Sequence, residues 1–196
     1  MTEVVLVRHG ETEWTRTRQH TGKTDIPLDE EGERQAQLVG EALRGREFGL
    51  VLTSPLKRAA ETCRLAGFGD VAQARAELAE WDYGEYDGRT TADIRAERPD
   101  WSLWRDGVPG GESTADVGRR ADHIVEELRR ASVDALVFGH GHQLRVLTAR
   151  WLGLEPSEGR LFALSTATLS VLGHERETPV IWRWNEPASV VRGSEV

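Results

Sequence analysis

The sequence has a single cysteine among its 196 residues, which excludes an internal disulfide. It also lacks an uncharged apolar stretch long enough to span a membrane, and no basic segment with an apolar core opens it. We therefore expect a cytoplasmic protein with no membrane partner. Basic residues are in deficit, with 25 Lys and Arg against 33 Asp and Glu, and the net charge of −8 argues against a nucleic-acid partner. An anionic substrate would need locally concentrated positive charge.

Short apolar runs alternate with amphipathic segments along the chain. We expect strands at 4–7, 49–53, 71–74 and 134–138, and helices at 29–45, 56–66, 113–131 and 143–152. This alternation predicts an α/β fold, a three-layer αβα sandwich with a mostly parallel sheet. Residues 161–184 suggest an antiparallel edge or closing hairpin. We expect one domain over 1–184 and a polar C-terminal tail over 185–196.

The first apolar run ends on Arg8, His9 and Gly10. Ligands of an open parallel sheet collect outside the carboxyl ends of its strands, so this tripeptide is expected at a binding edge. Arginine offers a planar fork of donors for phosphate, and a neutral imidazole can attack phosphorus. Gly10 would leave room for a close ligand. We interpret His9 as a nucleophile, although the tripeptide alone also fits a strand end that caps a turn.

Two further strand ends carry cationic or imidazole side chains. Arg58 lies in the first helical turn beyond Ser54, and His140 lies between two glycines after the 134–138 strand. Phosphoryl transfer needs an in-line nucleophile and positive contacts to the equatorial oxygens, which these residues can supply. The helix after Gly141 adds an N-terminus that favours an anion.

The departing alcohol oxygen requires a proton donor, which a carboxyl group can provide. Glu80 is the first choice because it lies in a loop-like segment with Gly84 and Gly88. Asp82 is the rival. The alternative that Glu80 is one of many surface acids stays open at this point.

Four segments, in this order, resemble motifs of the histidine phosphatase superfamily, the group of phosphoglycerate mutases and related phosphatases. They are LVRHGETEW at 6–14, SPLKRAAET at 54–62, LAEWDYG at 78–84 and VFGHG at 137–141. The resemblance implies a phosphoglycerate mutase-like fold, a phosphohistidine at His9 and no metal or other cofactor. It further implies a proton donor and a set of phosphate-binding residues: Glu80 as the donor, and Arg8, Arg58 and His140, with Thr21, Gly22 and Gly141 as further contacts.

Some positions depart from the family pattern or fall outside its motifs. Thr15 stands where many members have asparagine, and His142 stands where glycine is frequent. Both are candidates for the substrate pocket. Residues 90–104 suggest one or two short helices, from which Trp101 and Trp104 could cover the site, with ordinary packing as the alternative. Paired histidines can ligate metal, but no nearby carboxylate or cysteine completes a set around His140 and His142.

These features predict a phosphatase, a phosphomonoester hydrolase acting on a small phosphorylated metabolite. The segments QHTGKTD and EWDYG are similar to those of bacterial acid phosphatases and, more distantly, of sugar-bisphosphate phosphatases. We expect bisphosphoglycerate-dependent mutases to be longer between the acid motif and the second histidine, where this chain is short. A mutase-type phosphotransferase and a non-catalytic phospho-ligand binder are the alternatives, and a homodimer is left open.

Overall fold

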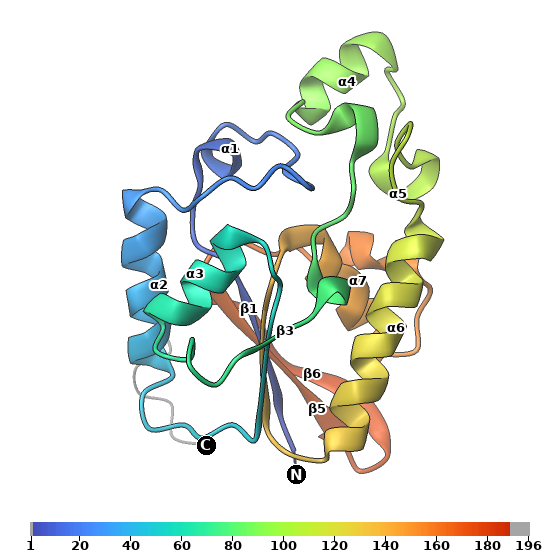
Figure 1. Cartoon of the computed structure of the whole chain (residues 1–196). Helices are drawn as coiled ribbons and strands as arrows, with labels where there is room; N and C mark the ends of the chain where they lie inside the picture. The colour runs from blue at the N-terminus through green and yellow to red at the C-terminus, as the bar shows by residue number, and fades with distance from the viewer. Residues whose placement is uncertain (1, 189–196) are drawn as a thin grey trace.

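A six-stranded mixed sheet forms the middle of the molecule in the computed structural model, which describes residues 2–188 (Figure 1). Its strands are β1 (Val4–Arg8), β2 (Leu50–Thr53), β3 (Gln73–Ala74), β4 (Ala135–Gly139), β5 (Thr168–Glu175) and β6 (Thr178–Pro187), in the order β3-β2-β4-β1-β5-β6. The β3, β2, β4 and β1 strands are parallel, whereas β5 pairs antiparallel with both β1 and β6. The mostly parallel sheet and its antiparallel edge are thus confirmed.

Helices cover both faces of the sheet, because successive side chains of a buried strand point to opposite sides. Val5 and Val7 of β1 pack with the helices α2 (Glu30–Ala42) and α3 (Lys57–Leu65). Val4 and Leu6 pack instead with α6 (Thr114–Ala131) and α7 (Gly141–Trp151). Figure 1 shows these two helix pairs on either side of the strands. The three-layer αβα sandwich predicted from the sequence is therefore confirmed.

The segment between β3 and α6 rises over the carboxyl ends of the parallel strands (Figure 1). It consists of short elements: the single-turn helices η1 (Ala76–Leu78) and η2 (Gly84–Tyr86), then α4 (Thr91–Glu97) and α5 (Leu103–Asp106). Of the one or two short helices expected within 90–104, α4 lies inside this range, and α5 begins at its end and continues to Asp106. A further short helix, η3 (Pro156–Leu161), follows α7.

A four-residue helix, α1 (Glu13–Arg16), was not expected from the sequence. Thr12 and Thr15 form a reciprocal cap, in which the Thr15 N–H donates to the Thr12 hydroxyl and the Thr12 N–H donates to the Thr15 hydroxyl. The usual capping partner at the third helical position is Glu or Gln, so a threonine pair gives a weaker sequence signal.

Two boundaries differ from the sequence prediction. The last strand continues to Pro187, so residues 185–187 belong to the sheet and not to the expected tail. The Asn185 N–H donates to the Ser170 hydroxyl, which fastens this end of β6 to β5. The rest of the predicted tail, from 189 onward, lies outside the described residues. Within 2–188, no helix is both long and apolar enough to cross a membrane.

Candidate active site

The carboxyl ends of β1, β2 and β4 meet at one edge of the sheet, as the sequence predicted. The His9 N–H donates to the Gly139 carbonyl at 3.0 Å, and the Ser54 N–H donates to the Phe138 carbonyl at 3.0 Å. The register of the strands therefore brings together the residues that directly follow the three strands. The rings of His9 and His140 lie 5.2 Å apart between centroids.

His9 is buried and held in one tautomer. Its Nδ1 lies 2.7 Å from the Gly10 carbonyl oxygen, which can only accept a hydrogen bond, so Nδ1 carries the proton. Burial, followed by the positive charges of Arg58 and Arg8, holds the pKa of His9 well below its usual 6.5. The ring is therefore neutral and keeps a lone pair on Nε2, the form that a nucleophile requires.

Gly10 serves the packing of this turn. A Cβ at Gly10 would lie 2.4 Å from the Gly32 carbonyl oxygen, which is closer than atoms can approach. The glycine therefore lets the turn lie against α2, and the expectation that it makes room for a ligand is wrong. The Gly10 N–H donates to the Thr62 hydroxyl at 3.0 Å, and this hydroxyl donates to the Arg58 carbonyl at 2.7 Å. Thr62 thus links the His9 turn to α3.

Arg8 and Arg58 bring two guanidinium groups to the site without acidic hydrogen-bond partners. Arg8 Nη1 donates to the Leu164 carbonyl at 2.5 Å. Arg58 donates from Nη2 to the carbonyls of Thr21 and Gly22, both at 3.0 Å. Its Nη1 donates to the carbonyl of Thr24 at 3.2 Å. Burial lowers the pKa of both arginines from 12.5, and arginine nonetheless stays charged in proteins.

Three buried nitrogens at this strand edge have no hydrogen-bond partner within residues 2–188. They are Nε of Arg8, Nε of Arg58 and Nδ1 of His140. Buried polar groups are almost always paired in folded proteins, so three unpaired nitrogens in one place, two of them guanidinium N–H donors, indicate a place for an acceptor. A phosphoryl group, with three equatorial oxygens, matches this need.

Glu80 lies at the N-terminus of α7. Its Oε1 accepts from the backbone N–H of Trp81 and of Gln143, both at 2.9 Å, and its Oε2 accepts from the N–H of His142 at 3.0 Å. These bonds explain why α7 begins at Gly141, two residues before the predicted start: a carboxyl from a distant segment satisfies its free N–H groups.

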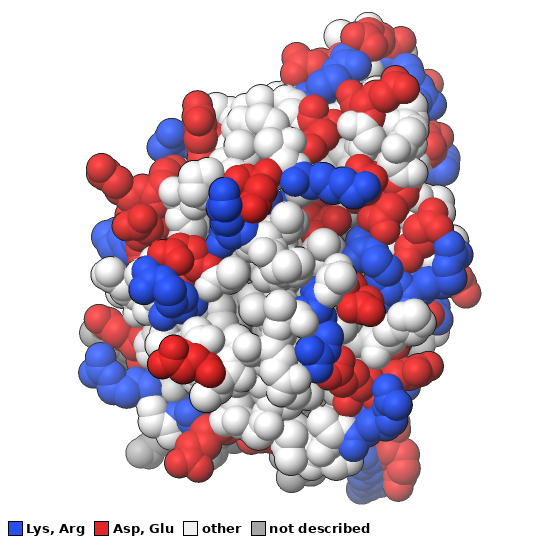
Figure 2. Space-filling view, viewed as in Figure 1, with Lys and Arg blue, Asp and Glu red and all other residues white. Residues whose placement is uncertain are grey.

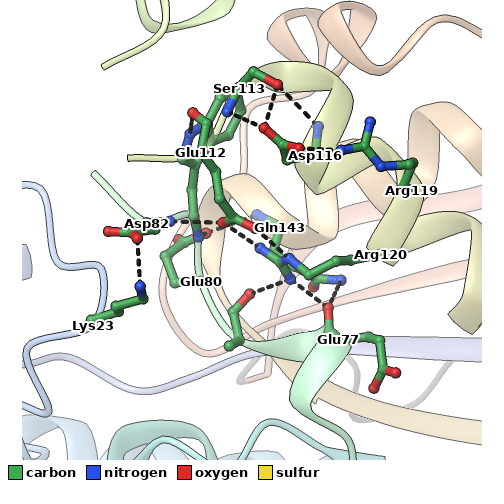
Figure 3. Close-up of polar contacts among 12 residues, drawn as sticks. Lys23, Glu77, Glu80, Asp82, Glu112, Ser113, Asp116, Arg119, Arg120 and Gln143 are labelled. Carbon is green, nitrogen blue, oxygen red and sulfur yellow. Dashed lines mark hydrogen bonds and ion pairs between the residues drawn. The ribbon is translucent and has the colours of Figure 1, made fainter. Parts of the chain in front are cut away.

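Asp82 is directed elsewhere. Its carboxylate pairs with Lys23 at 2.6 Å, and Figure 3 shows this pair beside Glu80. It also accepts the Gly84 N–H at 3.0 Å. Asp82 is absent from the lining of the cavity that contains Glu80 and His9. Of the two carboxyl groups considered, Glu80 is therefore the one placed for chemistry.

An Arg120 clamp, which sequence reasoning missed, holds the segment that carries Glu80. Arg120 Nη1 donates to the carbonyls of Glu77 and Ala79 at 2.6 and 3.0 Å, while Nε and Nη2 bind the Glu112 carboxylate (Figure 3). Glu112 in turn accepts the Asp82 N–H at 2.9 Å. No local pattern marks either residue, since the backbone groups that they hold lie 30 to 43 positions away.

The site opens into a cavity of about 260 Å³. It is lined by Arg8, His9, Thr15, Arg18, Gln19, His20, Thr21, Glu80, Tyr83, Gly141, His142, Arg145 and Leu164. Seven of these were predicted as site or pocket residues. Arg18, Gln19, His20, Tyr83, Arg145 and Leu164 were not. Arg58 and His140 are fully buried and are not among these lining residues.

Gly22 is placed differently from the prediction. Its N–H donates to Asp87 at 2.7 Å rather than facing the cavity, and its carbonyl accepts from Arg58. Asp87 also accepts from the N–H and hydroxyl of Thr24 at 3.1 and 2.7 Å. The loop between α1 and α2 is therefore fastened by Asp87 on one side and by Arg58 on the other, and it presents Arg18, Gln19, His20 and Thr21 to the cavity.

The prediction that Trp101 and Trp104 cover the site is wrong. Trp101 is 3% exposed, donates its indole N–H to the Gly107 carbonyl and packs against Tyr86. Trp104 packs against His142, and the Arg145 guanidinium lies over its ring at 4.7 Å. Both tryptophans support residues behind the cavity because their large apolar rings gain most from burial.

His142 lines the cavity, as predicted, and pairs with a tyrosine. Its Nδ1 lies 2.5 Å from the Tyr83 hydroxyl. Burial, with Arg145 next, holds the pKa of His142 well below 6.5, and burial raises the pKa of Tyr83 well above 10. Both groups are therefore neutral near pH 7. Residues 2–188 contain no group of three or more His, Cys, Asp or Glu side chains arranged to hold a metal ion.

Comparisons with known proteins agree with this geometry. The model of the histidine phosphatase superfamily (branch 1) matches residues 4–187. An acid phosphatase of Mycobacterium tuberculosis is 40% identical over 197 aligned positions, which cover 97% of each chain. A solved structure of mycobacterial glucosyl-3-phosphoglycerate phosphatase superposes with a TM-score of 0.85 at 28% identity, over 95% of this chain and 100% of that one.

A mutase is also among the relatives of this chain. A 2,3-bisphosphoglycerate-dependent phosphoglycerate mutase of Brucella anthropi is 33% identical over 207 aligned positions, which cover 95% of this chain and 94% of the mutase. A match over almost the whole of both chains means that similarity alone does not separate the phosphatase from the mutase activity. The match over almost the whole chain settles the family: the protein belongs to the histidine phosphatase superfamily, branch 1.

Proposed function

We propose that this protein hydrolyses a small phosphorylated metabolite, a phosphomonoester, through a phosphohistidine intermediate at His9. The observation that supports this most is a neutral His9, with its proton fixed on Nδ1, beside three buried side-chain nitrogens that have no hydrogen-bond partner within residues 2–188. A bound phosphoryl group would satisfy these nitrogens and stand within reach of the nucleophile. Arg8, Arg58 and His140 are the phosphoryl-binding residues in this proposal, and Thr21 and Gly141 line the cavity beside them.

In the first step, Nε2 of His9 attacks phosphorus and the bond between phosphorus and the ester oxygen breaks. Negative charge on the three equatorial oxygens is stabilised by Arg8, Arg58 and His140. Protonated Glu80 gives its proton to the departing alcohol oxygen. The Gly10 carbonyl, which accepts from Nδ1, stabilises the positive charge that develops on the ring.

In the second step, water attacks the phosphohistidine. Glu80, now a carboxylate, takes one proton from the water as the new P–O bond forms and the P–N bond breaks. Inorganic phosphate leaves, His9 is neutral again, and Glu80 is protonated again. One carboxyl group therefore acts in turn as acid and as base, which fits its place on the cavity wall.

The cavity lining favours hydrolysis over transfer. A mutase must keep water from the phosphoenzyme, whereas Arg18, Gln19 and His20 give this cavity a polar wall that water can wet. A non-catalytic binder of phosphate would gain nothing from a carboxyl group that lines the same cavity as His9, because its negative charge would repel the ligand. Mutase-type transfer remains the second candidate because a mutase matches nearly the whole chain.

A phosphoester panel tests the proposal. Wild-type protein, His9→Ala and the control His174→Gln, whose histidine packs on Trp151 away from the cavity, are assayed for phosphate release with malachite green. A parallel assay measures mutase activity on 3-phosphoglycerate. We expect phosphate release by wild type and the control, and a loss of roughly a thousandfold or more in His9→Ala. Equal rates for His9→Ala and wild type would refute it, mutase activity alone would favour transfer, and inactivity in both assays would favour a binder.

Several sequence-based expectations stay predictions. They are a cytoplasmic location, the absence of a nucleic-acid partner, a homodimer and a single domain. Figure 2 shows acidic and basic side chains intermixed over the face viewed, around uncharged surface near its middle.

A further inference from the structure

We propose that Ser54 is a positioning residue whose hydroxyl donates to Nε2 of His140 and so keeps the single imidazole proton on Nδ1, the nitrogen that serves the phosphoryl group. This inference rests on the proposed function for its catalytic consequence. The hydrogen-bond arrangement that it describes exists in the free protein and can be measured there.

The Ser54 hydroxyl has a single hydrogen-bond acceptor available for its proton within the described residues. The side chain is fully buried, so water cannot accept from it. Its Oγ accepts the Leu56 N–H at 3.2 Å and lies 2.7 Å from His140 Nε2. Within residues 2–188 no other acceptor contacts this oxygen. Because a buried hydroxyl hydrogen needs an acceptor, the proton points to Nε2, which must then hold a lone pair.

The protonation of the His140 ring follows from this assignment. Burial, followed by the charge of Arg58, holds its pKa well below 6.5, so the ring carries one proton. With Nε2 accepting, that proton sits on Nδ1. Nδ1 is buried and has no partner in the described chain, like the Nε atoms of Arg8 and Arg58. All three are then N–H donors at one edge of the sheet.

The opposite tautomer would fail at both ends of the ring. A proton on Nε2 would donate to Ser54 and leave the serine hydrogen without an acceptor. Nδ1 would present a lone pair where the phosphoryl oxygens also carry lone pairs, and the two would repel each other. The hydroxyl therefore decides whether His140 attracts or repels the ligand.

The backbone fixes Ser54 for this task. Its N–H donates to the Phe138 carbonyl at 3.0 Å, two residues before His140. Pro55 follows and restrains the chain at the entry to α3. Strand pairing thus sets the separation of the hydroxyl and the imidazole, and this separation does not depend on a bound ligand.

Nitrogen-15 NMR of histidine-labelled protein tests the tautomer without substrate. We expect the Nδ1–H tautomer at His140 in wild type, in Ser54→Thr and in Ser170→Ala. Ser170 is a matched control, because it is also fully buried but its hydroxyl accepts from Asn185. In Ser54→Ala the proton is expected to shift to Nε2 in at least part of the population. An Nε2–H tautomer in wild type, or an unchanged tautomer in Ser54→Ala, would overturn the inference.

Kinetics then test the consequence. We expect kcat/KM of Ser54→Ala to fall about tenfold to a hundredfold, less than the roughly hundred- to thousandfold loss on deleting a donor outright. Ser54→Thr should recover most of it, and Ser170→Ala should match wild type. Equal kcat/KM for wild type and Ser54→Ala would overturn the positioning role. If wild type hydrolysed no phosphoester, the proposed function would fail, while the wild-type spectrum would still decide the tautomer. Should Ser54→Ala not fold, wild type and Ser54→Thr carry both measurements.

Discussion

Lowering the pH from 7.5 to 5.5 should cost this protein a large part of its folding stability. His9, His140 and His142 have pKa values held well below 6.5 by burial and by neighbouring positive charge. They stay neutral in the folded protein, whereas in the unfolded chain they take up protons below about pH 6.5. The stability that they supply is complete above that pH and is lost as the pH falls below it.

The size of this loss of stability follows from the linkage between proton binding and folding. At a pH one unit below the pKa of histidine in the unfolded chain, each histidine that stays neutral in the folded protein lowers the free energy of unfolding by about 1.4 kcal/mol. The three together cost about 4 kcal/mol, against a total of roughly 5 to 15 kcal/mol for a typical domain. Carboxyl groups with lowered pKa values, such as Asp106 at about 2, stay ionised across this range and contribute little.

Urea unfolding followed by the fluorescence of the seven tryptophans measures this change, in phosphate-free buffers of equal ionic strength. Phosphate is omitted because a ligand of the folded state would stabilise it. His142→Gln removes one of the three groups, so the fall between the two pH values should shrink by about a third. A fall below about 1 kcal/mol in wild type, or the same fall in wild type and variant, would refute the reasoning.

Three other predictions concern activity. Glu80→Gln should lower kcat/KM, which reports the first step, by roughly 10²- to 10⁴-fold on alkyl phosphates but much less on p-nitrophenyl phosphate, whose leaving group departs without a proton; equal losses of kcat/KM on both would speak against a proton donor. Asp87→Ala removes the acceptor of the Gly22 N–H and of both Thr24 donors, so it should raise KM about tenfold and speed proteolysis within 17–27. An unchanged KM would contradict a fastened loop. Because the pKa of His9 is lowered, kcat/KM at pH 5.5 should be no lower than at pH 7; a decline tracking an ordinary histidine between these values would argue against a neutral nucleophile.

The grouping of the candidate site residues could be predicted because strand ends are a local signal with a general spatial consequence. An apolar run that stops at Arg8 and His9, and another that stops at His140, place these groups at one edge whatever the details of packing. The predicted sheet and its antiparallel edge rest on the same periodic patterns. Arg145 could also have been found, since it lies four residues beyond Gly141 on the same helix face.

The remaining cavity residues depend on contacts that no local pattern reveals. Gln19 and His20 reach the cavity because Asp87, some 65 positions beyond the loop, fastens the loop in place. Trp101 was misassigned because an aromatic residue near a site fits both a lid and a buried support. Its 3% exposure shows that burial of the ring prevailed.

The way arginines are used explains how an acidic chain can bind an anion. Arg120 forms an ion pair with the Glu112 carboxylate and thereby holds the segment that carries Glu80. Arg8 and Arg58 instead donate to backbone carbonyls, which orient a guanidinium but leave its net charge unneutralised. An acidic partner at either position would cancel the attraction for phosphate and form a buried ion pair with no capacity for ligand. The excess of acidic residues is therefore compatible with the function only because it stays on surfaces such as that in Figure 2, while carbonyl groups hold the arginines of the site.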